Sequence, residues 1–156
     1  MRVHVCAVGR MRAGPELSLV EDYLARFDRT GRALGLGAAK VLEVEDRKGG
    51  GQKAEAELLV KAIPKGSLIL ALDERGKTLS SPEFAGKLAN WRDDGRSDLA
   101  ILIGGADGIA PDLRARVDFS ISFGKMVWPH MLARVMLAEQ LYRATSILAG
   151  TPYHRC

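Results

Sequence analysis

Two glycine-containing turns in the second half of the chain carry residue types suited to holding a small ligand. They are LAILIGGADGIAP at residues 99–111 and SISFGKMVWPH at residues 120–130. In each, an apolar run ends in a glycine turn, which is typical of a strand that stops at a loop. Because glycine lacks a Cβ, such a turn adopts positive φ and lets a ligand approach the backbone closely. The pattern predicts a binding site for one small molecule, built largely from backbone N–H and C=O groups.

The C-terminal residues TPYHRC place three side chains capable of chemistry next to one another. Tyr153 offers a ring that stacks, and His154 is a group that titrates near neutral pH. Arg155 carries a planar guanidinium that binds phosphate or stabilises negative charge. The alternative interpretation is a frayed tail without a role, because chain ends are often poorly ordered. The residue types alone leave both interpretations open.

Other ligand classes are disfavoured by the same residues. The GGADG turn lacks the G-x-G-x-x-G pattern of dinucleotide sites because Gly104 and Gly105 are adjacent, and no acidic residue ends the following strand. The sequence contains no GK[ST] phosphate loop, no G-x-S-x-G elbow and no H-E-x-x-H pair. Its histidines and cysteines are not clustered as metal ligands, and His4 is predicted to be structural. We therefore expect neither a nicotinamide cofactor nor a metal.

The composition is that of one ordinary globular domain spanning residues 1–156. Hydrophobic residues make up 47% and charged residues 27%, and no run of about 18 apolar residues is present to cross a membrane. The N-terminal apolar stretch is too short for a secretory signal, and Cys6 and Cys156 do not make a disulfide framework. These features predict a cytoplasmic protein.

A formal net charge of +4 is compatible with a nucleic-acid partner but does not require one. Five basic residues are candidates for a surface that faces phosphate, namely Arg10, Arg12, Arg47, Lys48 and Lys53. We interpret them instead as ordinary solvated side chains.

Apolar runs alternate with helical patterns, which predicts an α/β fold with a mainly parallel sheet flanked by helices. The expected strands are residues 3–8, 41–44, 67–72, 99–103 and 119–123, and the expected helices are residues 15–32, 54–63, 81–91, 111–116 and 129–148. Residues 73–77 are expected to turn. Ligands in open α/β sheets bind beyond the carboxyl ends of the strands. The ends at Leu72, Gly104 and Phe123 are therefore expected at one edge of the sheet.

The last predicted helix carries apolar side chains around nearly its whole circumference. A helix of this kind is buried on all sides, and one sheet face of a small domain does not cover it. We therefore predict a homodimer with this helix in the interface; the alternative is cover by loops of the same chain. Glu139 and Arg143 are spaced to pair along this helix.

Taken together, five segments resemble the RlmH-type ribosomal RNA methyltransferases of the SPOUT superfamily, which methylate N3 of a pseudouridine in large-subunit RNA. The segments are VCAVG, IGGADG, SFGKMVWPH, RVMLAEQLYRA and PYHR, in the family's order and at fitting spacing. The resemblance covers essentially the whole chain. It implies a C-terminal trefoil knot, S-adenosylmethionine as methyl donor, a homodimer, and 23S ribosomal RNA within an assembled ribosome as the partner. A trefoil knot is one of the rare exceptions to unknotted folds.

Residue roles follow from the same resemblance by position. It implies a cofactor pocket formed by Leu72, Gly104, Phe123, Gly124, Lys125, Met126, Val127 and Trp128. It also implies that Tyr153, His154 and Arg155 act in catalysis.

In this interpretation Tyr153 positions the base, and His154 helps N3 lose its proton, either as a base or through water. Arg155 stabilises negative charge on the ring carbonyls. The tail of one subunit is expected to reach over the cofactor of the other. The alternative function is a non-catalytic knotted protein that binds RNA or the ribosome, and a nicotinamide oxidoreductase is the more distant rival.

Overall fold

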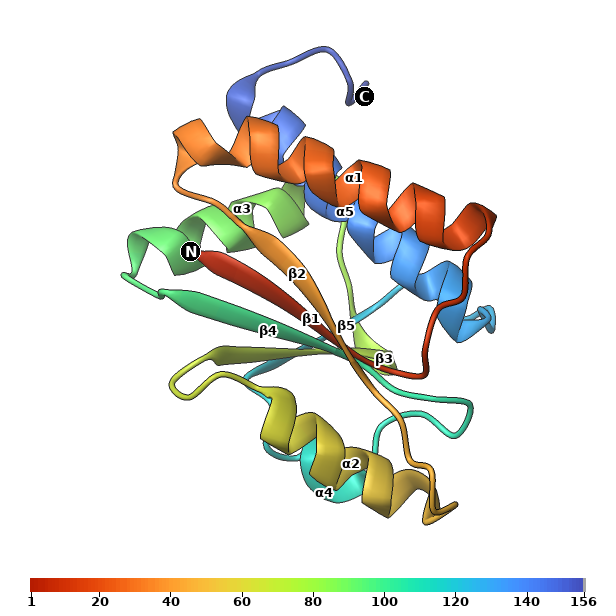
Figure 1. The fold of residues 1–156 in the computed structure, drawn as a ribbon. Coiled ribbons are helices and arrows are strands. Elements are labelled where there is room, and N and C mark those ends of the chain that lie inside the picture. The colour runs from red at the N-terminus through yellow and green to blue at the C-terminus, as the bar shows by residue number, and fades with distance from the viewer. Residues whose placement is uncertain (156) are drawn as a thin grey trace.

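Five parallel strands form the central sheet, in the order β2–β1–β4–β3–β5 (Figure 1). In this computed structural model, which describes residues 1–155, every neighbouring pair of strands is parallel. The predicted α/β class with a parallel sheet is confirmed. Cys156 lies outside the described residues. The strands are β1 Arg2–Val8, β2 Ala39–Val44, β3 Leu68–Thr78, β4 Asp98–Ile103 and β5 Phe119–Ser122.

Helices cover both faces of the sheet, as expected for buried parallel strands (Figure 1). One face carries α1 Pro15–Gly31, α3 Ser81–Asp93 and α5 His130–Ala149, and the other carries α2 Gly51–Ala62 and α4 Pro111–Arg114. A short 3₁₀ turn, Arg32–Leu34, follows α1. Within residues 1–155, no helix is long and apolar enough to cross a membrane.

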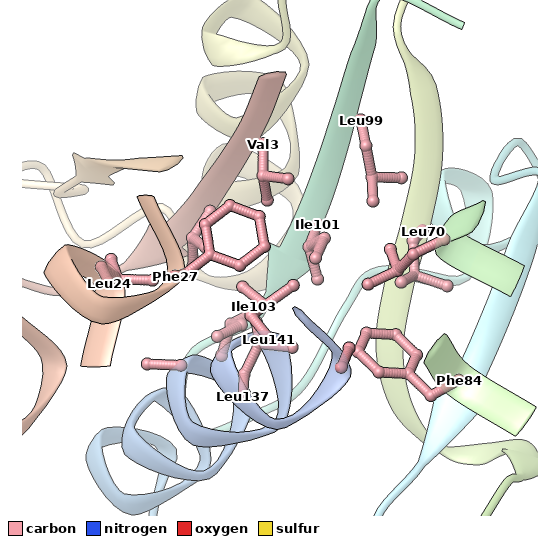
Figure 2. Packing of buried hydrophobic residues seen from close by; sticks show 14 of the residues in the cluster. Val3, Leu24, Phe27, Leu70, Phe84, Leu99, Ile101, Ile103, Leu137 and Leu141 are labelled. Atoms are coloured by element: carbon pink, nitrogen blue, oxygen red, sulfur yellow. The ribbon is translucent and has the colours of Figure 1, made fainter. Parts of the chain in front are cut away.

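Side chains of the central strands alternate between the two helical layers. Leu99 and Ile101 of β4 pack with Phe27 of α1 and with α5, in the larger core shown in Figure 2. Leu102 of β4 points to the other face and joins the smaller core with Leu59 of α2. Each fully buried aliphatic side chain of this kind contributes about 1.5–3 kcal/mol. Burial on both faces explains why β4 reads as a continuous apolar run.

β3 continues through residues 73–77, where the sequence pattern suggested a turn, so that prediction is wrong. Its first half pairs with β4, and its register against β5 shifts between Leu72 and Lys77. A Cβ on Gly76 would stand 2.6 Å from the carbonyl carbon of Ile121, so glycine permits the close approach of β5. Polar side chains such as Glu74 are exposed here. The second half of β3 is polar and contains glycine, so its composition is that of a turn.

α5 is buried along a stripe rather than on all sides. It packs against α1 and α3, and Leu137 and Leu141 are fully buried in the larger core. Leu132 remains 42% exposed, so loops of the same chain do not complete the cover. The homodimer remains a prediction, and a second subunit would cover this surface. The trefoil knot likewise remains an expectation of the resemblance.

Candidate functional site

The strand ends singled out by the sequence meet in one cleft of about 280 Å³. It lies at the carboxyl edge of β4, between the middle of β3 (residues 72–75), the turn after β4 and the loop that joins β5 to α5. Lys125 is exposed in that loop but does not line the cleft. The other predicted cofactor residues do line it, namely Leu72, Gly104, Phe123, Gly124, Met126, Val127 and Trp128.

The turn after β4 is too tight for a side chain at its first glycine. A Cβ on Gly104 would stand 2.6 Å from the carbonyl carbon and 2.7 Å from the oxygen of Gly108. The turn is closed by the Gly108 N–H, which donates to the Gly105 carbonyl at 3.0 Å, and Gly108 has a φ of +76°. Gln52 at the start of α2 donates to the Asp107 carbonyl at 2.7 Å. The backbone wall of the cleft is therefore held in one shape.

The loop after β5 forms the opposite wall. The Ser122 hydroxyl accepts from the Gly124 N–H and donates to the Gly124 carbonyl, both at 3.1 Å. Gly124 adopts a φ of +108°, which explains the glycine at this position. Beyond it, Met126 and Val127 are 74% and 87% exposed. Large apolar side chains this exposed beside a cleft are suited to covering a flat apolar ligand.

An acidic residue that the sequence analysis assigned to a turn lies in the same cleft. Asp73 is only 9% exposed, and its Oδ1 accepts from the Arg75 backbone N–H at 2.8 Å. Its carboxylate also lies 3.5 Å from the guanidinium of Arg75 and 3.8 Å from that of Arg114. The signal available in the sequence is an aspartate directly after an apolar strand, at the edge where ligands bind.

A second carboxylate lies beneath the β4 turn. Glu55 of α2 has a buried Oε2 without a hydrogen-bond partner, and a Cβ on Gly105 would stand 2.7 Å from that atom. Burial raises the pKa of Glu55, and the charges of Asp107 and Asp46 raise this pKa further, while His130 lowers it. This environment is assembled from segments far apart in the chain, so no local pattern indicates it.

A buried arginine ties the start of α5 to the end of β1. Arg134 is 2% exposed, and its guanidinium donates to Glu43 Oε2 at 2.6 Å and to the Gly9 carbonyl at 3.0 Å. Glu43 also accepts from the Met11 backbone N–H at 2.6 Å. His130, one turn before Arg134, lines the cleft. Arg134 therefore holds the helix end on which one wall of the cleft rests.

The C-terminal tail is anchored on α5 rather than frayed. The Tyr153 hydroxyl donates to Glu139 Oε1 at 3.0 Å, and Arg143 donates to the same oxygen at 2.6 and 2.9 Å, which confirms the predicted Glu139–Arg143 pair. Arg143 also donates to His154 Nδ1 at 3.2 Å. Burial, together with the hydrogen bond to Glu139, raises the pKa of Tyr153 above its usual range. Arg155 is exposed beside this network.

The cleft lies at the start of α5, whereas the tail folds back over the second half of this helix as far as Glu139 (Figure 1). Glu139 follows His130 of the cleft by nine residues, about 14 Å at a rise of 1.5 Å per residue. None of Tyr153, His154 and Arg155 lines the cleft of its own chain. Whatever these side chains act on is either separate from the cleft or completed by another molecule.

A larger apolar groove of about 540 Å³ connects the two regions, between α1, α3 and α5. Glu139 of the tail network lines one part of this groove. Ser122, Phe123 and Gly124, which also line the cleft, line another part. The groove and the cleft therefore share one loop. Within residues 1–155, no group of three or more His, Cys, Asp or Glu side chains is placed to hold a metal ion.

Comparison with curated proteins finds relatives that match almost end to end. The chain is 72% identical over 155 residues to "Ribosomal RNA large subunit methyltransferase H" of Ruegeria sp. (strain TM1040), covering 99% of each sequence. It is also 72% identical over 155 residues to the protein of that name from Dinoroseobacter shibae, again covering 99% of each.

Solved structures and a family model agree with this similarity. A probable methylase family protein from Haemophilus influenzae superposes with a TM-score of 0.50 at 13% identity, covering 99% of this chain and 70% of that one. A probable methyltransferase from Bordetella pertussis gives 0.50 at 14% identity, covering 92% and 95%. These two likenesses show the fold alone. Residues 1–154 match the family described as "Predicted SPOUT methyltransferase". The chain therefore belongs to the SPOUT methyltransferases and, within them, to the RlmH-type proteins.

Proposed function

We propose that this methyltransferase transfers a methyl group from S-adenosylmethionine to N3 of a pseudouridine in large-subunit ribosomal RNA, as a homodimer in the cytoplasm. The name of the relatives at 72% identity supports ribosomal RNA as the substrate. The observation that carries the proposal is the cleft between β3, the end of β4 and the end of β5, because its glycine turns and exposed apolar side chains meet at one edge of the sheet.

The residues of the cleft fit S-adenosylmethionine in chemistry. The volume of about 280 Å³ is just below the usual lower end of ligand pockets, about 300 Å³. The backbone of the β4 turn would hold the polar groups of the nucleoside, while Leu72 and Trp128 would cover the apolar faces of its base. Asp73 supplies an acceptor for hydroxyl or amino groups. When bound, S-adenosylmethionine supplies a methyl group on a sulfonium, which is electrophilic without help from a metal.

The contribution of the protein to the reaction is mainly alignment. Holding a nucleophile and an electrophile in attack geometry supplies roughly 7–11 kcal/mol of a barrier. N3 of the base carries a proton that must leave, and the resulting negative charge spreads over the ring carbonyls. Tyr153 would position the base, and Arg155 would stabilise the developing charge. These roles require the tail to lie near a cleft.

A homodimer would meet this requirement. The groove between α1, α3 and α5 is apolar, and exposed Leu19 and Leu132 add to the uncovered surface. A second copy of the chain is its expected occupant. In a twofold dimer both subunits use the same patch, so two α5 helices that run in opposite directions place the tail of one subunit at the cleft end of the other. Because the groove and the cleft share residues 122–124, the partner would border the cofactor directly.

One chain of this size offers only a small surface for binding a large RNA. Sequence-specific binding of RNA usually relies on aromatic side chains that stack on splayed bases. The net charge of +4 gives only modest attraction to phosphate. We therefore propose that a surface shared by the two subunits reads the shape of an assembled ribosome.

The test is transfer of labelled methyl from S-adenosylmethionine to free 23S RNA, isolated large subunits and whole ribosomes that lack the modification. Digestion and mass spectrometry of the nucleosides then locate the label. We expect label on one pseudouridine, with whole ribosomes as the best substrate. Binding of cofactor and ribosomes without any transfer would favour the non-catalytic alternative, and label on another nucleoside would refute the substrate assignment.

A further inference from the structure

We propose that Arg143 fixes the tautomer of His154, so that His154 acts on the substrate as a hydrogen-bond donor through Nε2 and not as the base. The inference rests on the proposed function, because it concerns the group that meets the target nucleotide. It assigns Arg143 and Glu139 as positioning residues, and it gives His154 a donor role in place of the help with proton removal that the resemblance implied.

The direction of one hydrogen bond determines the tautomer of His154. The Arg143 Nη1 atom lies 3.2 Å from Nδ1 of His154. A guanidinium has five N–H donors and no acceptor, so Arg143 is the donor in this contact. Nδ1 must therefore present its lone pair, and the proton of the neutral ring sits on Nε2. In this tautomer the free nitrogen of His154 is an N–H, which donates a hydrogen bond and does not accept a proton.

The guanidinium of Arg143 is held in one orientation by its other contacts. Its Nε and Nη2 atoms donate to Glu139 Oε1 at 2.9 and 2.6 Å, and its carbon lies 4.8 Å from the centre of the Tyr153 ring. Two N–H groups on one carboxylate oxygen, with a ring against the plane, hold the fork in one orientation. Nη1 is therefore held toward His154.

A proton on Nδ1 of His154 would need a hydrogen-bond acceptor close by. Glu139 is the carboxylate of this network, and its Oε1 already accepts from Tyr153 as well as from Arg143, while its Oε2 accepts from Gln140 at 3.0 Å. Tyr23 of α1 stacks on Tyr142, with ring centroids 6.3 Å apart. A protonated Nδ1 would face the Arg143 cation and lose its hydrogen bond. The network thus favours an unprotonated Nδ1.

The consequence for the reaction is a division of labour. N3 of the base gives its proton to water and forms the bond to the methyl carbon, while the carbon–sulfur bond breaks and its electron pair stays on sulfur. Negative charge on the ring carbonyl oxygens builds up as the proton leaves. The Nε2–H of His154 donates to one of these oxygens, as donors in oxyanion holes do, where one donor is worth about 10²–10³-fold in rate.

Two substitutions that mimic different ring nitrogens separate a donor from a base. The amide nitrogen of glutamine reaches the position of Nε2, whereas that of asparagine reaches only Nδ1. We expect His154→Gln to keep single-turnover methylation within about tenfold of wild type, and His154→Asn and His154→Ala to lose about 100-fold or more. The pH profile of the wild type should keep the same shape in the glutamine variant. A glutamine variant as inactive as the alanine variant would overturn the donor role.

A second measurement needs neither substrate nor turnover. Nitrogen-15 NMR of the whole protein with labelled histidine distinguishes protonated from unprotonated ring nitrogens, and the His154→Gln variant assigns the His154 signals. We expect Nδ1 unprotonated and Nε2 protonated at neutral pH, with a mixture of tautomers in Arg143→Met. A protonated Nδ1 in the wild type would overturn the inference. Wild-type protein with the expected tautomer but no methylation of ribosomes would refute the proposed function instead.

Discussion

The cleft at the carboxyl edge of the sheet and the tail network on α5 are built on opposite principles. The cleft is formed by backbone at glycine turns, and most of its side chains are apolar or exposed. The tail is a set of side chains, Glu139, Arg143, Tyr153 and His154, joined by hydrogen bonds of 2.6–3.2 Å. Backbone turns bind a ligand through its shape. Linked polar side chains instead determine which of their own atoms carry charge and protons.

This difference predicts different sensitivities to mutation. The cleft should lose ligand binding when a Cβ is added at a glycine, because its binding surface is formed mainly by the backbone. The tail should lose activity when a hydrogen-bond donor or acceptor is removed, whereas added side-chain volume should matter less. The two regions also share no residue, since none of the tail residues lines the cleft, so damage to one should leave the other intact within a chain.

The largest effect is expected from Gly104→Val. The added Cβ would lie 2.6–2.9 Å from backbone atoms of Gly108 and Ile109, which cannot move without opening the turn. We expect loss of S-adenosylmethionine affinity by about 100-fold or more in calorimetry, since overpacking at a rigid site is strongly unfavourable. Gly86→Ala is the matched control, because a Cβ there meets nothing within 4 Å. Retained affinity in Gly104→Val would place the cofactor elsewhere.

Arg134→Met tests the anchor beneath the cleft. The substitution leaves Glu43 and the Gly9 carbonyl without their buried donor, at a cost of about 2–4 kcal/mol in the free energy of unfolding. Urea denaturation measures the loss. Arg26→Met is the control, since its ion pair with Asp22 is largely exposed and its loss should cost much less. Equal effects in both variants would show that Arg134 is no anchor.

Tyr153→Phe should disturb the tail alone. It removes the donor to Glu139, worth about 1 kcal/mol, and should lower methylation while cofactor affinity stays within about twofold. The pKa of Tyr153 is raised in the folded chain, so the unfolded chain ionises first. The stability from this group is therefore present below about pH 10 and lost as pH rises further. Denaturation at pH 8 and at pH 11 should show this loss in the wild type and a smaller one in the variant.

Glu55→Gln is expected to have the smallest effect. Burial raises the pKa of Glu55, so the folded chain disfavours the carboxylate, and the penalty is present above the ordinary pKa of a glutamate and absent below it. The variant should be more stable than the wild type at pH 7, on the order of 0.5 kcal/mol or less after solvent screening, and equal to it at pH 4. Glu57→Gln, on the exposed side of the same helix, is the control. A variant less stable at pH 7 would contradict the sign.

The strands that end at the cleft could be predicted because their signals are local. β4 is an apolar run buried on both faces, and Gly104 ends it with a turn that only glycine fits. The second half of β3 could not be predicted, since its pairing with β5 depends on a register shift and its residues are polar. Nothing within residues 73–77 distinguishes such a strand from a turn.

The contacts that join distant segments were also beyond local patterns. Arg134 meets Glu43, 91 positions away, and Glu55 lies under a turn some fifty residues later. The tail motif is visible in the sequence, but only the structure shows that it packs on the second half of α5 and does not line the cleft.

The measurement that tests the composite site most directly is complementation between two defective chains. Gly104→Val disables the cleft and His154→Ala disables the tail, so neither homodimer should methylate ribosomes. Mixed dimers purified through two tags contain one intact cleft and one intact tail on different subunits. We predict recovery of about half the wild-type activity per dimer, because one of the two twofold-related sites is whole. Mixed dimers as inactive as both parents would contradict a site shared between subunits.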